Sequence, residues 1–226
     1  MAEQDPLIHK FPRTRHILDA GGSGVTRDDL LFDKKEAIEF LKNDVIVEEK
    51  VDGANLGIYV TKDWQICYQN RAHYVSSATA AQWKPLDNWL EQHPGIWNVL
   101  TSPDIIIFGE WCYQKHSIEY AKLPDYFLCF DIFDRKENKF YSIDERNKML
   151  EGSGISTVRT INRGQFSKED IIKMLDTPSQ YRTEGPVEGV YVRIDGEKYN
   201  ISRGKVVRPD FVQHIEKHFT KLKFVK

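Results

Sequence analysis

Cysteine is scarce in this chain, and long hydrophobic runs are missing from it. Only three cysteines occur among the 226 residues, Cys67, Cys112 and Cys129, and none of them forms a CxxC pair. We therefore expect reduced thiols in an intracellular, cytoplasmic or nucleoplasmic compartment rather than a disulfide scaffold or a zinc site. The longest apolar run, around residues 105–108, is far too short to cross a bilayer, and the polar first ten residues do not resemble a signal peptide. These absences predict a soluble protein with no membrane partner.

An excess of either charge is also missing. The chain has 32 basic and 34 acidic residues and a formal net charge of −2. This balance excludes a uniformly basic surface for nucleic acid but leaves room for a local basic groove. Without repeats or long linkers, we expect a single domain over residues 1–226. Its parts would be a basic N-terminal segment with a first helix (1–44), a core (45–210) and a C-terminal helix (211–226).

Local sequence patterns predict a mixture of strands and helices. Val, Ile and Tyr residues on either side of Lys50 favour two strands, and Asp52-Gly53 between them favours the tight turn of a hairpin. Capping residues before residues 34, 143 and 168 predict helices there. Apolar strands are expected over 104–111 and 126–134, and a late hairpin over 187–202. The strands and helices do not alternate regularly, so we predict an α+β fold with mainly antiparallel sheets and flanking helices.

Several charged residues stand at the ends of predicted strands. Glu110 closes an apolar strand, where a carboxylate needs a partner or water. Glu188 begins another strand, and Arg203 and Lys205 are expected just beyond the last one. With Lys50, these charges suggest a cleft that handles a polyanion and a metal ion. The alternative is a row of ion pairs along the rim of a sheet.

Five short motifs occur in a characteristic order: KVDGAN (50–55), FGEW (108–111), FLCFDIF (127–133), EGVYV (188–192) and RGK (203–205). They resemble motifs I, III, IIIa, IV and V of the covalent nucleotidyltransferases, the superfamily of ATP-dependent DNA and RNA ligases and mRNA capping enzymes. Asn55 stands where DNA ligases and capping enzymes usually carry arginine, so the chain resembles the RNA ligase branch that includes the phage nick-sealing enzymes. The resemblance implies the ATP-grasp-like adenylation fold of ligases. Arg203 departs from the Lys-x-Lys that many RNA ligases have there.

The resemblance also implies a three-step reaction with ATP. Lys50 would attack the α-phosphate and carry AMP, AMP would pass to an RNA 5′-phosphate, and a 3′-hydroxyl would then displace it. An unperturbed lysine has a pKa of about 10.4, so ionisation alone withholds about 4–5 kcal/mol at pH 7. Cations beside Lys50 would favour the neutral amine. The resemblance assigns Lys205 and Arg203 to the α-phosphate, and Glu188 and Asp52 to Mg²⁺ or Mn²⁺.

Other motif positions would hold the nucleotide. By resemblance, Glu110 binds the ribose hydroxyls, Phe130 stacks on adenine and Glu49 contacts the adenine amino group. Asn55 and Arg71 would face the phosphate of AMP or the incoming RNA end. For Phe130 the alternative is an ordinary aromatic residue of the core.

We expect a monomer that binds RNA ends, with repair enzymes as candidate partners. Two basic segments are hypothetical phosphate contacts to pyrophosphate or RNA: Lys10, Arg13, Arg15 and His16 near the N-terminus, and Lys217, Lys221 and Lys223 near the C-terminus. For the N-terminal segment the alternative is a solvated basic loop. Two other functions remain open. One is a DNA ligase adenylation domain or a guanylyltransferase, and the other is a non-catalytic scaffold that binds RNA ends.

Overall fold

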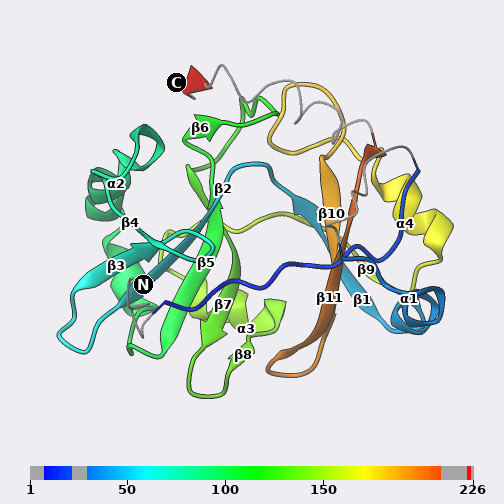
Figure 1. Ribbon diagram of the computed structural model, residues 1–226, viewed down its shortest axis with the longest axis horizontal. Coiled ribbons are helices and arrows are strands. Elements are labelled where there is room, and N and C mark those ends of the chain that lie inside the picture. Colours follow the sequence, from blue (N-terminus) through cyan, green and yellow to red (C-terminus); the bar gives the residue numbers. More distant parts are fainter. Residues whose placement is uncertain (1–7, 22–29, 210–222, 225–226) are drawn as a thin grey trace, which may run out of the picture. The chain divides into compact units, whose positions relative to one another are not determined.

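The computed structural model describes residues 8–21, 30–209 and 223–224 (Figure 1). Its residues group into two compact units. The first unit contains residues 1–12, 53–113 and 125–157, and the second unit contains residues 13–52, 114–124 and 158–226. Each unit is built around an antiparallel sheet, so the predicted α+β class is confirmed.

The first unit contains a six-stranded antiparallel sheet in the order β4-β3-β2-β5-β7-β8. Its central strands are almost wholly buried, and their near-continuous apolar sequences are typical of strands covered on both faces. One of its core clusters contains Phe11, Tyr59, Ile106, Phe108 and Phe133. The strands are β2 (Ala54–Val60), β3 (Ile66–Gln69), β4 (Tyr74–Val75), β5 (Ile105–Trp111), β7 (Phe127–Asp134) and β8 (Lys139–Phe140).

Short helices complete the first unit. Pro85 separates the first two of them, because η1 (Ala81–Trp83) ends before it and α2 (Leu86–Gln92) begins after it. Two more helices, η2 (Pro94–Asn98) and α3 (Ile143–Leu150), follow. Ser142 caps α3 as predicted, since its side chain accepts a hydrogen bond from the Glu145 amide.

The second unit contains a four-stranded antiparallel sheet in the order β11-β10-β1-β9. The strands are β1 (Val45–Lys50), β9 (Thr160–Gly164), β10 (Gly189–Asp195) and β11 (Asn200–Val207). Alternate residues of a strand point to opposite faces, and five valines of β1, β10 and β11 share one face and enter the core. The residues between them form a polar face. Two shorter strands, β6 (Gln114–Lys115) and β12 (Lys223–Phe224), pair with each other.

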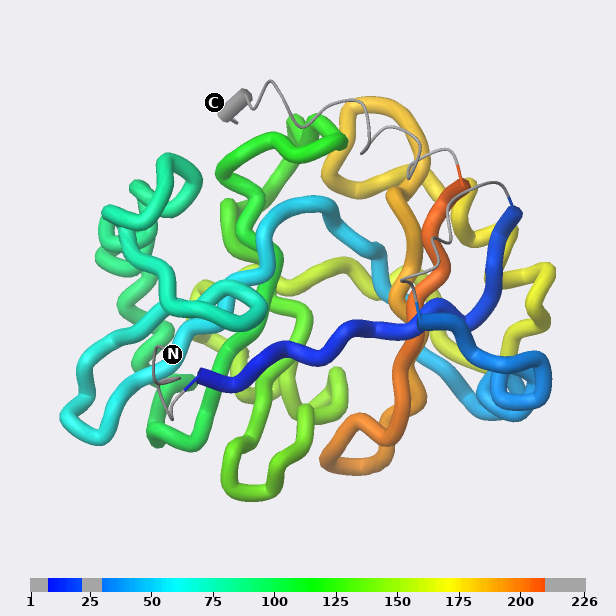
Figure 2. The backbone as a smooth tube through the Cα atoms, in the orientation of Figure 1, coloured from blue at the N-terminus to red at the C-terminus, as the bar shows by residue number. Residues whose placement is uncertain are grey.

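Helices α1 (Lys34–Leu41) and α4 (Lys168–Met174) belong to the second unit and begin where the sequence predicts. Asp33 caps α1, and Ser167 with Asp170 forms a reciprocal capping box on α4. Residues 15–17 run beside β11 (Figure 2). There the Ile17 amide donates to the Lys205 carbonyl at 3.0 Å and the Lys205 amide donates to the Arg15 carbonyl at 2.9 Å.

The close approach of this segment to β11 requires a glycine. A Cβ atom built at Gly204 would lie 2.3 Å from Cγ1 of Ile17. Such a contact forces the neighbouring chain to move, so the absence of a side chain at this position lets residues 15–17 pair with β11.

Two local predictions are wrong, and one strand was missed. β1 and β2 do not form a hairpin, because β1 pairs with β9 and β10 whereas β2 pairs with β3 and β5. An Asp-Gly turn specifies a change of chain direction, but partners far along the chain decide the pairing. Arg203 and Lys205 lie within β11 rather than beyond the last strand. Strand β9 was not predicted, since its sequence TINRG alternates weakly.

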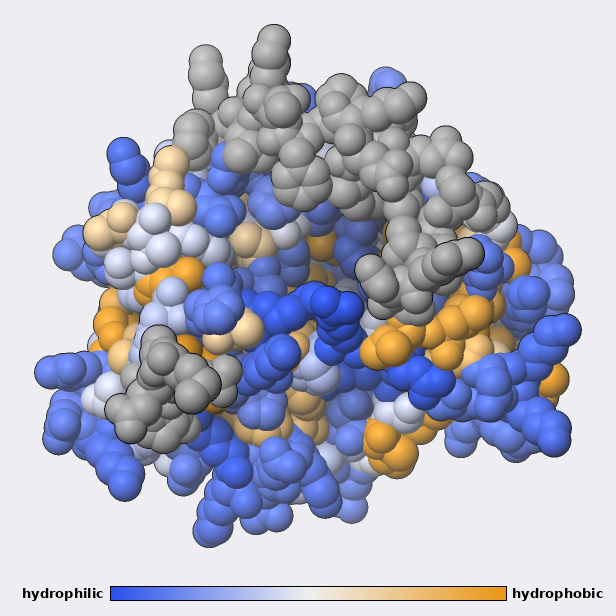
Figure 3. Space-filling view, in the orientation of Figure 1, coloured by the Kyte–Doolittle hydropathy of each residue, from blue (hydrophilic) through white to orange (hydrophobic). Residues whose placement is uncertain are grey.

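The predicted C-terminal helix falls largely on residues outside the described ranges, and the two described residues there form β12. Within the part of the chain that the structure describes, no helix combines the length and the apolar sequence needed to span a bilayer. Hydrophilic side chains cover most of the face shown in Figure 3. The larger hydrophobic side chains are mainly buried in the cores of the units.

Candidate active site

Lys50 is held at the C-terminal end of β1 against a buried carboxylate. The register pairs Lys50 with Gly189 at the start of β10, which brings the preceding residue, Glu188, to the lysine side chain. Nζ of Lys50 donates a hydrogen bond to Oε1 of Glu188, and the two groups form an ion pair. The side chains are 18% and 3% exposed, respectively. The structure therefore joins the first and fourth sequence motifs, which are 138 residues apart.

Burial makes Glu188 a strongly perturbed acid. Loss of solvation raises its pKa from 4.5 to about 7, although the Lys50 ammonium opposes this rise. The negative charge of Asp52 adds to the rise, and the Lys205 ammonium opposes it. Perturbed acids of this kind are concentrated at functional sites. Lys50, Asp52, Glu188 and Lys205 thus interact electrostatically, as expected if they form one site.

Asp52 is fixed by the loop that follows β6. Its Oδ2 atom accepts hydrogen bonds from the backbone amides of Ser117 at 2.7 Å and Ile118 at 3.1 Å. Its own backbone amide donates to the hydroxyl of Tyr120 at 2.8 Å. These contacts hold a second carboxylate two residues beyond Lys50. Tyr120 lies outside every motif of the sequence, so no local signal predicted it.

The two carboxylates suit a hard divalent cation. Glu188 Oε2 is buried and accepts no hydrogen bond from any described residue. A buried carboxylate oxygen needs a partner, and Mg²⁺ prefers oxygen ligands. Residues 8–21, 30–209 and 223–224 contain no group of three or more His, Cys, Asp or Glu side chains that could hold a metal. One or two carboxylates suffice for Mg²⁺ when phosphates of a substrate complete its coordination.

Cationic side chains continue the polar face of the second unit's sheet. Arg203 and Lys205 lie two residues apart on β11, so they share a face, and Lys205 pairs in register with Tyr191 of β10. Tyr191 in turn pairs with Glu48 of β1, two residues before Lys50. The register therefore places both predicted phosphate-binding cations on the same face as Lys50.

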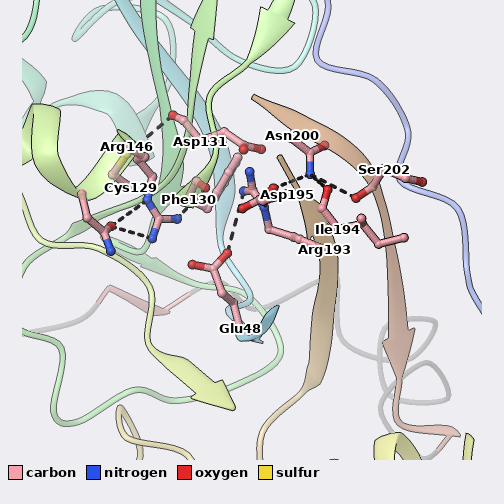
Figure 4. A network of polar contacts seen from close by, with 11 residues as sticks. Glu48, Cys129, Phe130, Asp131, Arg146, Arg193, Ile194, Asp195, Asn200 and Ser202 are labelled. Atoms are coloured by element: carbon pink, nitrogen blue, oxygen red, sulfur yellow. Dashed lines mark hydrogen bonds and ion pairs between the residues drawn. The ribbon is translucent and has the colours of Figure 1, made fainter. Parts of the chain in front are cut away.

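A buried ionic cluster that was not predicted from the sequence lies on this face (Figure 4). Nη1 of Arg193 lies 3.9 Å from Oε2 of Glu48, and Nε of Arg193 lies 3.5 Å from Oδ1 of Asp195. Asn200 donates to the same Asp195 oxygen at 2.8 Å. The signal was available, because Tyr191, Arg193 and Asp195 alternate with apolar residues along one strand.

Glu49 points to the opposite face from Lys50 and is 1% exposed. Its carboxylate accepts hydrogen bonds from the Ser179 hydroxyl at 2.5 Å and the Gln180 amide at 3.2 Å, and Arg159 lies 3.9 Å away. Burial raises the pKa of Glu49, and these donors oppose the rise. In this structure Glu49 anchors the segment that contains Ser179. Its predicted contact with adenine stays a prediction.

In the first unit, Glu110 and Asn55 are neighbours on adjacent strands, β5 and β2. Oε1 of Glu110 accepts a hydrogen bond from the Gly53 amide at 2.9 Å. Oδ1 of Asn55 is buried and has no hydrogen-bond partner among the described residues. A Cβ atom at Gly53 would lie 2.6 Å from the carbonyl oxygen of Trp111, so the close packing of the backbone there requires the glycine of the first motif.

Phe130 and Arg71 also belong to the first unit. Phe130 is half-buried in the otherwise buried β7, and its ring packs edge-on against Phe11 at 5.4 Å between centroids. Arg71 is exposed, and its carbonyl accepts a hydrogen bond from the Phe11 amide at 2.9 Å. Within the first unit, Phe130 and Arg71 thus both contact Phe11 of the N-terminal segment. The roles of Phe130 and Arg71 remain predictions.

The basic N-terminal residues differ in their surroundings. Lys10 and Arg13 are exposed, and His16 is buried beside β11. Arg15 makes two hydrogen bonds to the Glu36 carboxylate, at 2.5 and 2.6 Å, and its guanidinium lies 4.4 Å from the centre of the Phe32 ring. Arg15 therefore has an intramolecular role, which weakens the hypothesis that it contacts RNA. Lys217 and Lys221 lie outside the described residues, as does the side chain of Lys223.

Comparison with known proteins identifies the family. A family model described as RNA ligase matches residues 43–207, which contain all five motifs. The chain belongs to the RNA ligase family. None of the curated proteins compared with the chain matches it.

Solved structures of the RNA ligase of Naegleria gruberi share the fold. A mutant with ATP and Mn is 18% identical with a TM-score of 0.65, over 92% of this chain and 58% of that chain. Another mutant, with AMP and Mn, is 17% identical with a TM-score of 0.61 over the same shares. A third, without ligand, is 20% identical with a TM-score of 0.61, over 89% of this chain and 62% of that chain. The chain therefore spans about three-fifths of the length of these proteins.

Proposed function

We propose that the protein is an ATP-dependent RNA ligase that joins 5′-phosphate and 3′-hydroxyl ends through a lysyl-AMP intermediate. The observation that carries the proposal is the ion pair between Lys50, in the KxDG motif, and the buried Glu188 of the EG motif. Membership of the RNA ligase family supports it, and so do similar structures of another ligase that contain ATP or AMP with Mn.

In the first step, Nζ of Lys50 attacks the α-phosphorus of ATP. A phosphorus–nitrogen bond forms, the bond to the β-phosphate oxygen breaks, and pyrophosphate leaves. The amine must be neutral to attack, and the attacked phosphate gains negative charge that nearby cations stabilise. Lys205 and Arg203 are the proposed cations, because they share the sheet face of Lys50.

Glu188 and Asp52 are the proposed ligands of Mg²⁺ or Mn²⁺, because no described residue donates a hydrogen bond to Oε2 of Glu188 and the Asp52 charge acts on the same carboxylate. When bound, the cation would compete with the Lys50 ammonium for Glu188 and neutralise phosphate charge. We assign the ribose hydroxyls to Glu110 and the adenine ring to Phe130, and retain Glu49, Asn55 and Arg71 as proposed nucleotide contacts from the motif resemblance.

Labelling with nucleotide tests the first step. The protein is incubated with Mg²⁺ and α-labelled ATP or GTP and then separated on a denaturing gel. We expect the ATP label on the wild type and on Lys62→Ala, an exposed lysine in the turn after β2, and its loss from Lys50→Ala. Label from GTP alone would indicate a guanylyltransferase and contradict the proposal.

Sealing assays test the substrate. We expect joining of 5′-phosphorylated RNA, measured on nicked duplex, broken hairpin, single-stranded and DNA-containing substrates. Joining of DNA only would indicate a DNA ligase. Label on Lys50 without joining of any substrate would instead support a scaffold that binds RNA ends, or an enzyme that needs a repair partner.

The surroundings of the protein are part of the proposal. Three free cysteines, two of them buried, are compatible with a reducing intracellular compartment, cytoplasmic or nucleoplasmic. RNA ends are the proposed partners, together with repair enzymes that generate those ends, and the protein would act as a monomer.

A further inference from the structure

Phe130 occupies a β-bulge. Between β5 and β7, Phe108 pairs with Asp131 and the next residue, Gly109, pairs with Cys129, so Phe130 is the extra residue of β7 at this register shift. A bulge inserts one residue, bends the strand and redirects a side chain. Phe130 is accordingly the least buried residue of β7. The bulge explains why this ring, unlike its neighbours, is partly accessible.

A buried arginine holds the backbone of this bulge. Strand β8 pairs with Phe133 and Asp134 of β7, and Cys129, just before Phe130, forms an isolated bridge to Thr157. Nη1 of Arg146, from α3, donates to the Phe130 carbonyl at 2.7 Å. Figure 4 shows the guanidinium beside this stretch of β7.

The guanidinium is itself oriented. Nε and Nη2 of Arg146 both donate to Oδ1 of Asn147, at 3.1 and 2.9 Å. Arg146 is only 1% exposed. Arginine is rarely buried so completely, because its charge loses hydration, and an apolar residue would fill the same space at lower cost. The Arg146 guanidinium is a planar fork of donors. Two of its nitrogens are held by the Asn147 side chain and a third binds the Phe130 carbonyl, so it constrains the β7 backbone as an apolar side chain could not.

We propose that Arg146 is a positioning residue for nucleotide binding: it fixes the bulge at Phe130 and thereby the orientation of the ring that stacks on adenine. This inference rests on the proposed role of Phe130. In this role Arg146 acts through the Phe130 backbone and not on the reacting atoms. It acts on the affinity for ATP through the ring that it orients.

The test is a double-mutant cycle on the adenylylation of Lys50, with Arg146→Met, Phe130→Ala and the double variant. Loss of an aromatic ring that stacks on a base weakens binding by about 5- to 150-fold. We expect Phe130→Ala to raise KM for ATP within this range and Arg146→Met to raise it at least about threefold, with kcat nearly unchanged. In the Phe130→Ala background, Arg146→Met should then change KM by less than about twofold.

Two further variants separate positioning from folding. Arg146→Lys keeps one donor for the Phe130 carbonyl, so we expect it to restore much of the KM. Arg135→Met is the matched control, because Arg135 lies in the same unit with its guanidinium over the Tyr59 ring at 4.7 Å. It should lower thermal stability without raising KM. If Arg146→Met alters only stability or kcat, or if its effect on KM multiplies with that of Phe130→Ala, the positioning role is refuted.

The result for Phe130→Ala distinguishes the two levels of the proposal. An unchanged KM in this variant would refute the stacking role of Phe130 and the inference that depends on it. A raised KM in Phe130→Ala with no effect of either Arg146 variant would refute the positioning role alone.

Discussion

Replacing Glu188 by glutamine should alter how the stability of the protein depends on pH. Burial raises the pKa of Glu188 to about 7, from 4.5 in an exposed glutamate. Between these values the folded protein retains a proton that the unfolded chain has lost, so the free energy of unfolding falls as pH rises. At about 1.4 kcal/mol for each unit of pKa, the wild type loses about 3 kcal/mol between pH 4.5 and pH 8 through this one group.

Glutamine carries no charge, so Glu188→Gln removes this contribution. We expect the variant and the wild type to have similar stability near pH 4.5, and the variant to be more stable by about 3 kcal/mol at pH 8. Urea denaturation at both pH values measures the difference, with a chelator present so that divalent cations do not stabilise the wild type. Glu91→Gln, at an exposed position of α2, is the control and should follow the wild type. If the free energies of unfolding of Glu188→Gln and the wild type change with pH in the same way, the raised pKa of Glu188 is refuted.

Three further predictions concern stability. Gly53→Ala would place a Cβ 2.6 Å from the Trp111 carbonyl oxygen, and we expect it to lower the free energy of unfolding by about 1–3 kcal/mol in urea denaturation. Ser167→Ala removes the N-cap of α4 and should cost about 1 kcal/mol by the same measurement. Arg15→Ala removes the contacts to Glu36 and Phe32, and we expect a loss of about 1 kcal/mol that shows as a lower Tm.

Each of these has a matched comparison. Gly196→Ala meets only ordinary contacts, the shortest at 3.4 Å, so it should be far milder than Gly53→Ala, and equal losses would contradict the packing argument. Ser167→Thr should retain most of the cap, and a loss equal to that of Ser167→Ala would exclude capping as the cause. The double variant Arg15→Glu with Glu36→Arg exchanges the two charges, so it should recover part of the Tm that Arg15→Glu loses alone. No recovery would exclude the ion pair as a source of stability.

Much of the site was predictable because its motifs lie at strand ends, where local patterns are strong. The Val and Ile residues before Lys50 and after Glu188 predict two strands, and the structure contains both. Asp33 and Ser167 are helix caps whose side chains make the expected hydrogen bonds. Such features depend on residues a few positions apart, so the sequence alone determines them.

Long-range pairing was not predictable to the same degree. The Asp52-Gly53 turn favours a hairpin between the neighbouring strands, yet β1 pairs with β10 and leaves β2 to another sheet. The bulge at Phe130 depends on the register of β5 against β7. The Phe130 carbonyl accepts its hydrogen bond from Arg146, which lies 16 residues further along the chain in α3. Both depend on partners that are distant along the chain.

The sequence by itself thus determined the order of the motifs, the strands that carry them and the helix caps, since each follows from local backbone and side-chain preferences. Only the tertiary structure decided that Glu188 faces Lys50, that Arg193 and Glu48 share a buried cluster, and that Arg146 supports Phe130. The physical reason is register: a shift of one residue between two strands moves every side chain to the opposite face, and burial of the valine face selects one alignment.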